Sequence, residues 1–173
     1  HSLIYELLKS NKVDWDYLKR YTNSNWLVYN NPGNENHGLF ARDEDNLPLI
    51  YCNTNKKITS ANDQNANSSF FGTYKYNDID VIPSFELLSK EYLDSKYKPE
   101  NISDSIDISA DVIKRIAAEI AETAFEKEIE IKIDWEDFNG KKHSSFKGRP
   151  ISMHAMRGIS AHSNGFSTCK LIH

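Results

Sequence analysis

The side chains best suited to hold a ligand are gathered near the end of the sequence, in ISMHAMRGISAHSNGF (residues 151–166). A guanidinium, an imidazole, hydroxyls and an amide are groups that bind phosphate or carboxylate oxygens. Glycine lets the main chain approach a ligand closely or adopt a positive φ. We therefore expect an anion-binding turn made by Arg157, Gly158, Ser160, His162, Ser163, Asn164 and Gly165.

The segments on either side of this turn predict how it is positioned. ISMHAM (residues 151–156) has the composition of a buried strand, and Ser163 or Asn164 is placed to begin the last helix. In open α/β sheets, ligands lie at the carboxyl ends of strands and beside helix N-termini, where free N–H groups and the helix dipole favour an anion. The strand, turn and helix together therefore predict a phosphate site.

Other interpretations of the same residues stay open. Gly158 and Gly165 can serve only to shape a turn, and His162 can be a structural histidine. GISAH departs from the G-x-S-x-G nucleophile elbow at its last position, and no acidic residue follows Ser160, which disfavours a serine hydrolase. The compact spacing of zinc ligands is missing from the histidines that could form a metal site, namely His143, His154 and His162.

The rest of the chain predicts an α/β protein, with helices packed on a mostly parallel sheet, an inserted β-hairpin and a long polar loop. Helical spacing of apolar residues predicts helices over 2–10, 13–22, 84–94, 98–106 and 109–127. Strand patterns occur over 26–29, 38–43, 47–52, 70–85 and 128–137, the last alternating isoleucines and a tryptophan with charged residues. The Asn-rich stretch 53–69 is too polar to bury much area, which predicts a surface loop.

Composition excludes several classes of protein. The chain has 173 residues, of which 39% are hydrophobic and 27% charged, and this is typical of one globular domain. A net charge of −4 and a pI near 5.9 argue against nucleic-acid binding. No apolar run approaches the roughly 18 residues that a membrane span needs. Cys52 and Cys169 are too few and too far apart for a disulfide framework or a zinc ribbon.

Four segments resemble the large subunits of the molybdopterin oxidoreductase family. KPENISDSIDISADVIKRIAAEIA (98–121) is similar to a family segment in which Pro-Glu opens one helix and a second helix carries Ile-x-x-Ile-Ala. VDWDYLKRYTNSNWLV (13–28) and LFARDEDNLPLIY (39–51) resemble the family's Arg-Tyr-Thr-Asn stretch and the variable hairpin after it. The most specific segment is GRPISMHAMRGISAHSNGF (148–166), whose glycine, histidine and glycine match the family's cofactor-binding turn. Its full form is closest to the branch that acts on sulfur oxyanions.

The resemblance implies a function and a cofactor. The chain would be an internal fragment, inactive alone, of a multi-domain enzyme that binds molybdenum bis(molybdopterin guanine dinucleotide). The seven residues of the turn would face this cofactor, with His162 nearest to the molybdenum, while the metal ligand and a 4Fe–4S cluster would lie elsewhere in the full protein. The implied partners are a small oxyanion substrate, an iron–sulfur electron-transfer subunit, and a membrane anchor subunit. The compartment is not specified by the sequence.

The same resemblance divides the chain into three parts, and the sequence departs from the family's pattern at one place. Residues 1–28 would belong to one α/β domain, 29–82 to a variable insertion, and 83–173 to a cofactor-binding α/β domain. The family's Thr-Gly before the long helix is Ile106-Asp107 here, so an aspartate stands where glycine would take a positive φ. The alternative function is a self-contained, non-catalytic α/β nucleotide-binding or interaction module.

Overall fold

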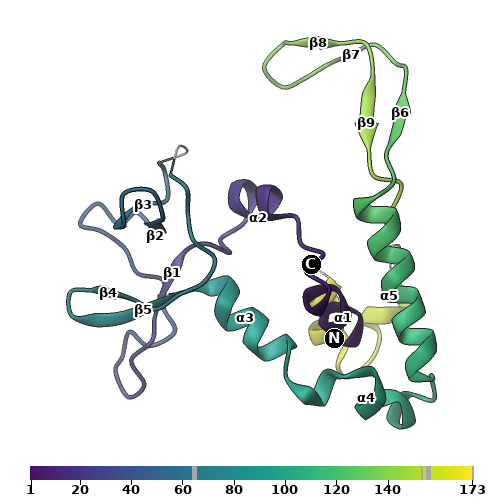
Figure 1. The fold of residues 1–173 in the computed structure, drawn as a ribbon, viewed down its shortest axis with the longest axis horizontal. Helices are drawn as coiled ribbons and strands as arrows, with labels where there is room; N and C mark the ends of the chain where they lie inside the picture. The colour runs from purple at the N-terminus through teal and green to yellow at the C-terminus, as the bar shows by residue number, and fades with distance from the viewer. Residues whose placement is uncertain (64–65, 153, 155–156, 173) are drawn as a thin grey trace. The chain divides into compact units, whose positions relative to one another are not determined.

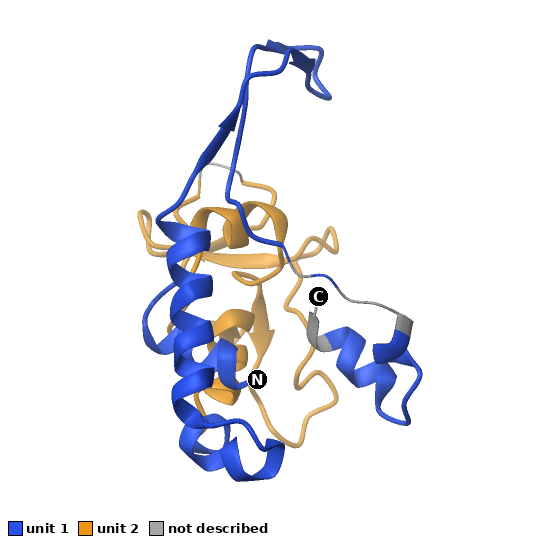
Figure 2. Cartoon of the chain, turned by 90° about the vertical axis from the view of Figure 1, so that its right-hand side faces the viewer, with its two compact units in different colours: residues 1–12, 95–173 blue, residues 13–94 orange. Residues whose placement is uncertain are grey.

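The computed structural model describes residues 1–63, 66–152, 154 and 157–172, which form two compact units. Unit 1 consists of His1–Lys12 and Ser95–His173, and unit 2 of Val13–Asp94 (Figure 2). No helix among these residues has both the length and the apolar composition that a membrane crossing requires. Each of the two units has its own helices and strands and its own buried side chains.

Unit 1 is mainly helical (Figure 1). Its helices in chain order are α1 (Ser2–Lys9), the 3-10 helix η1 (Ser95–Tyr97), α4 (Pro99–Ile106), α5 (Ala110–Phe125), the 3-10 helix η2 (Arg157–Ser160) and α6 (Gly165–Ile172). α5 packs against α1 and α4 and buries Ile113, Ala117 and Ala121. The alanines on this face allow close approach of another helix, whereas the sequence led us to expect a sheet beneath them.

Local signals in the sequence fix the ends of these helices. The Ser109 hydroxyl accepts a hydrogen bond from the Val112 N–H at 3.4 Å, so Ser109 caps α5. Pro99 begins α4, where a missing N–H costs nothing. Asp107 ends α4 in the left-handed conformation, with φ 53°, which confirms the expected strained turn in place of glycine.

Unit 2 contains the sheets that surround the larger buried clusters. Its elements are α2 (Trp15–Tyr21), β1 (Leu27–Tyr29), β2 (Leu49–Cys52), β3 (Lys57–Ser60), β4 (Tyr74–Tyr76), β5 (Ile79–Pro83) and α3 (Ser84–Tyr92). β1, β5 and β4 form a three-stranded antiparallel sheet in that order, and β2 pairs with β3. Asn77 and Asp78 both have positive φ, which suits the tight turn between β4 and β5.

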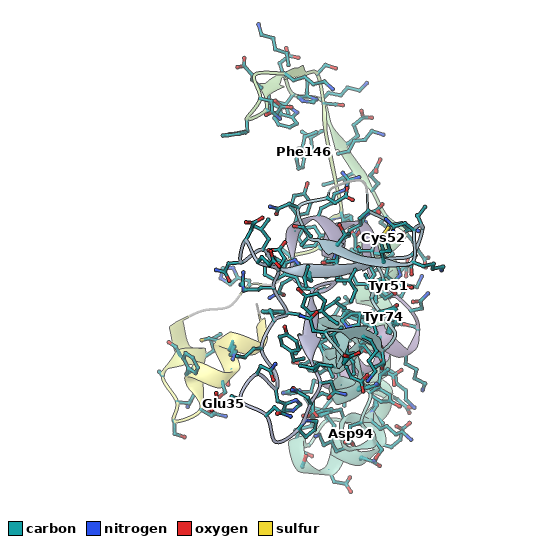
Figure 3. The ribbon with its side chains drawn as sticks, turned by 90° about the vertical axis from the view of Figure 1, so that its left-hand side faces the viewer. Glu35, Tyr51, Cys52, Tyr74, Asp94 and Phe146 are labelled. Atoms are coloured by element: carbon teal, nitrogen blue, oxygen red, sulfur yellow. The ribbon has the colours of Figure 1, made fainter. Side chains whose placement is uncertain are left out.

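Strand β2 is buried on both of its faces. Leu49 packs with Leu27, Ala41 and Val81 in one cluster, and Ile50 packs in another with the buried residues Cys52 and Ala66. Tyr51 of β2 stacks on Tyr74 of β4 with ring centroids 3.6 Å apart (Figure 3). A strand covered on both sides matches the continuous apolar run LPLIYC in the sequence.

The prediction of a mostly parallel sheet is wrong for the described residues. Every strand pair there is antiparallel: β1–β5, β2–β3, β4–β5, β6–β9 and β7–β8. The physical reason is connectivity, because short turns join most paired strands, whereas parallel strands need a long crossover. The fold is still mixed α/β.

Two further expectations need correction. The polar loop 53–69 contains β3, whose main chain pairs with β2 from Leu49↔Ser60 to Cys52↔Lys57. Composition does not predict β3, because main-chain hydrogen bonds to β2, and not burial of its side chains, stabilise most of this strand. The described residues of the strand expected over 151–156 form no strand: Ile151, Ser152 and His154 are exposed and belong to none. The other residues of that segment lie outside the description.

A long two-stranded hairpin, here called the arm (residues 127–150), follows α5 in unit 1 (Figure 1). It consists of β6 (Ile129–Ile131), β7 (Trp135–Glu136), β8 (Lys142–His143) and β9 (Phe146–Gly148). β6 pairs with β9 and β7 with β8. Gly140 supplies the positive φ of 77° at its turn.

Candidate functional site

The predicted anion-binding residues form a compact turn between η2 and α6. The Ala161 N–H donates to the Gly158 carbonyl at 3.2 Å, which closes η2. The Gly165 N–H donates to the His162 carbonyl at 2.8 Å, which leads the chain into α6. Residues 161–164 between these two bonds are exposed, so their polar groups face the surface.

Gly165 has a clear structural role in this turn. A Cβ at this position would lie 2.3 Å from the Ser160 carbonyl oxygen, which no side chain tolerates without a shift of the main chain. Gly158 differs, because a Cβ there would meet nothing within 4 Å and its φ is not positive. The turn therefore requires the second glycine for close packing, while the first leaves an open surface beside η2.

The start of α6 presents main-chain donors. The Asn164 carbonyl accepts from the Thr168 N–H at 3.0 Å and from the Thr168 hydroxyl at 3.1 Å, so α6 begins at the predicted place. Within the described part of the chain, the N–H groups of Ser163, Asn164 and Phe166 have no hydrogen-bond acceptor. Unpaired N–H groups at a helix start carry a partial positive charge, which favours an anion.

The seven residues predicted to bind the anion differ in how far they are exposed. Gly158, Ser160, His162, Ser163 and Asn164 are exposed, and Gly165 is buried. Arg157 belongs to η2, but its side chain lies outside the description. Ile151, Ser152 and His154 form no strand, so among the described residues just before the turn the structure provides the helix start of the expected site and no strand end.

The alternative metal site is not assembled in the residues that the structure describes, since no group of three His, Cys, Asp or Glu side chains there could hold an ion. His143 lies on the arm, where its Nε2 is 3.0 Å from Asp137 Oδ2. This hydrogen bond is the main cause that lowers the pKa of the Asp137 carboxyl below its ordinary value, with help from the Lys141 N–H.

The pair at the arm's turn is a feature that the sequence reasoning missed. Asp137 accepts hydrogen bonds from the Asn139 and Lys141 N–H groups as well as from His143. The His143 ring also stacks on Trp135 with centroids 4.4 Å apart. The Asn-Gly pair at 139–140 was the available signal, because it predicts a tight turn that brings residues on either side together.

Comparison with known proteins adds one relative. The chain is 37% identical over 177 aligned positions to a sulfite dehydrogenase subunit of Allochromatium vinosum, in an alignment that covers 96% of this chain. The chain spans 18% of that relative's length. No protein-family model matches the chain. The likeness is thus continuous along this chain and is confined to a small part of an oxidoreductase subunit.

Proposed function

We propose that the chain is a segment of the catalytic subunit of a molybdenum-dependent oxidoreductase, and that the whole protein moves an electron pair to or from a small sulfur oxyanion. The observation that carries this proposal is the 37% identity to a sulfite dehydrogenase subunit over 96% of the chain. The likeness includes both units, so it is not the likeness of one common supersecondary motif. It favours a piece of an enzyme over a self-contained binding module.

Within this function, the turn from Arg157 to Gly165 holds the diphosphate of a molybdopterin guanine dinucleotide. The fit rests on the unpaired N–H groups at the start of α6 and on the hydroxyl and amide groups of Ser163 and Asn164, which are exposed beside them. Gly165 keeps the main chain close to Ser160, where any Cβ would push the two apart. The open surface at Gly158 leaves room for a ligand next to η2.

The chain's residues bind and orient in this scheme, and they carry out no chemical step. When bound, the molybdenum cofactor supplies the site at which substrate electrons are exchanged. His162 is exposed at the turn, and in this proposal its imidazole contacts the cofactor's polar groups. Main-chain donors fixed by a helix need little reorganisation to receive a dianion. The molybdenum ligand and a 4Fe–4S cluster belong to other parts of the proposed subunit.

The proposal includes partners. The relative is named as a subunit, which implies an assembly, and we propose an iron–sulfur electron-transfer subunit, together with a membrane anchor subunit, for this protein. These subunits would exchange electrons with the catalytic subunit. The substrate class is a small sulfur oxyanion, with sulfite the first to be tested.

The whole polypeptide that contains this sequence provides the direct test. We expect the purified protein to contain molybdenum, to release a guanine nucleotide after acid treatment, and to reduce an artificial electron acceptor when sulfite is added. A protein with neither molybdenum nor guanine nucleotide, purified from cells that make the cofactor, would refute the proposal. Activity with another sulfur oxyanion and not with sulfite would keep the function and change the substrate.

One substitution tests the role of the turn. Asn164→Asp keeps a good helix-capping side chain, so α6 should still form, but it places a carboxylate where the phosphate would bind. We expect the bound guanine nucleotide to fall about tenfold or more through charge repulsion. Asn139→Asp, an exposed position at the arm's turn, is the matched control and should keep its cofactor. Equal cofactor content in both variants would remove the turn from the binding site.

A further inference from the structure

The arm has one apolar face and one charged face. In the register of β6 and β9, Ile131 lies opposite Phe146 and Ile129 opposite Gly148, so these residues share a face. Trp135 joins them, because its ring makes an edge contact with Phe146 at a centroid distance of 6.1 Å. Figure 3 labels Phe146 on this ribbon. Within β6 and β9 this face contains no charged side chain. Next to Trp135, His143 stacks on the indole and pairs with Asp137.

The opposite, charged face of the arm is stable in contact with water. Glu130 lies across from Lys147, and the Lys147 ammonium is 3.2 Å from the Glu128 carboxylate. Such exposed pairs need no further partner, because water solvates both charges. The two faces of the ribbon therefore differ: the charged face is satisfied by water, whereas the apolar face has no apolar cover among the described residues.

Among the residues that the structure describes, the apolar face is open to solvent. Its side chains keep between 38% and 50% of their surface exposed, as seen for Ile129, Ile131, Trp135 and Phe146. An isolated two-stranded hairpin is marginally stable in water and needs a further strand or a packed surface. Aliphatic and aromatic residues gathered on one exposed face are typical of a contact surface. The arm is thus built to be covered.

We propose that another part of the same polypeptide covers the apolar face of the arm. This inference rests on the proposed function only in that the chain belongs to a longer subunit, as the relative does. The part of this face formed by β6 and β9 carries no charge, so it resembles a permanent interface or a domain core cut in half, and not the polar rim of a transient contact. A cover on the same chain is present at high effective concentration while the arm folds, which a separate partner is not.

The occupant is therefore an apolar surface of a neighbouring domain in the same subunit. Trp135 and Phe146 are its expected anchors, because buried aromatic side chains dominate the energy of such contacts. The stack of His143 on Trp135 holds the indole in place before the contact forms. This assigns the arm a structural task, which is to join its own unit to the rest of the subunit.

Cysteine labelling of the complete polypeptide tests the proposal. Ile131→Cys places a thiol on the apolar face, and Glu130→Cys places one on the charged face of the same strand as its matched control. With a maleimide reagent and peptide mapping by mass spectrometry, we expect Ile131→Cys to react about tenfold or more slowly than Glu130→Cys. Equal rates would overturn the proposal. If Ile131→Cys does not fold, hydroxyl-radical oxidation of Trp135 in the unmodified protein decides in its place, and oxidation as fast as in the denatured protein would overturn it.

Measuring the same protection at different dilutions, and with and without other subunits, identifies which surface covers the arm. Protection that persists in the dilute monomer, separated from all other subunits, supports a cover on the same chain. Protection that is lost on dilution would point to a second copy, and protection lost on removing another subunit would point to that subunit; either result overturns the proposal. Molybdenum measured on the same sample separates the two claims, because protection without molybdenum refutes the proposed function alone.

Discussion

The hairpin β2–β3 and the arm are both two-stranded ribbons, but their side chains meet very different surroundings. Ile50 of β2 is 2% exposed and packs with Cys52 and Ala66, whereas Ile131 of the arm is 50% exposed. Their sequences differ in the same sense, since LPLIYC is a continuous apolar run and EIEIKIDW alternates strictly. A continuous run indicates burial on both faces, and alternation indicates burial on one.

This difference teaches that a sequence pattern can specify a contact that the described residues do not supply. The run in β2 predicts two covered faces, and unit 2 supplies both clusters. The alternation in the arm predicts one covered face, and the described residues leave it bare. The arm's missing neighbour is therefore inferred from its sequence pattern and its exposure together.

The largest expected effect compares one chemical change in the two hairpins. Ile50→Ala should lower the free energy of unfolding by about 2–5 kcal/mol, because it leaves a cavity in a packed cluster. Ile131→Ala in residues 1–173 should change it by only about 0.5 kcal/mol, since half of that residue is already in water. Urea unfolding with amide exchange measures both. Equal losses would mean that the arm is packed as well as β2.

The same contrast between covered and open positions applies to the two glycines of the turn. Gly165→Ala should destabilise the contact between η2 and α6 by about 1–3 kcal/mol, because the new Cβ meets the Ser160 carbonyl. Gly158→Ala meets open space and should be neutral within about 0.5 kcal/mol. Amide exchange of the α6 residues reports the difference. Similar exchange in both variants would show that the close approach at Gly165 is not needed.

A smaller effect is expected where one residue carries main-chain strain within the packed helices of unit 1. Asp107→Gly should stabilise the chain by about 1 kcal/mol, because glycine adopts the left-handed conformation without a Cβ penalty. Asp104→Gly, in the interior of α4, is the control and should destabilise by about 0.5–1 kcal/mol. Thermal unfolding measures both, and a loss of stability at Asp107 would contradict the assigned conformation.

The smallest effect concerns the arm's own internal contact. The pKa of Asp137 is lowered mainly by its hydrogen bond with His143, so the contribution of this contact is complete above the ordinary carboxyl value of 3.8. It is lost as the pH falls through the lower pKa of the folded state. We expect the NMR signal of the Trp135 indole N–H to move in that acid range. Asp137→Asn should abolish the change, and an unchanged titration in that variant would assign it elsewhere.

Much of the helical structure could be predicted because its signals are local. The Asp14 side chain accepts from the Tyr17 N–H and caps α2, as Ser109 caps α5, and both residues can be recognised from sequence alone. The start of α6 after Asn164 was predicted on the same grounds. The open side chains at His162 and Ser163 could not be derived, because exposure depends on what the rest of the chain covers.

The sequence by itself determined the helices, their caps, and the apolar and charged faces of the arm, because these follow from hydrogen bonds and spacing within a few residues. Only the tertiary structure decided that the strands pair antiparallel, that polar β3 joins β2, and which residues cover the two faces of β2. Strand pairing depends on partners distant in sequence, and composition cannot choose among them.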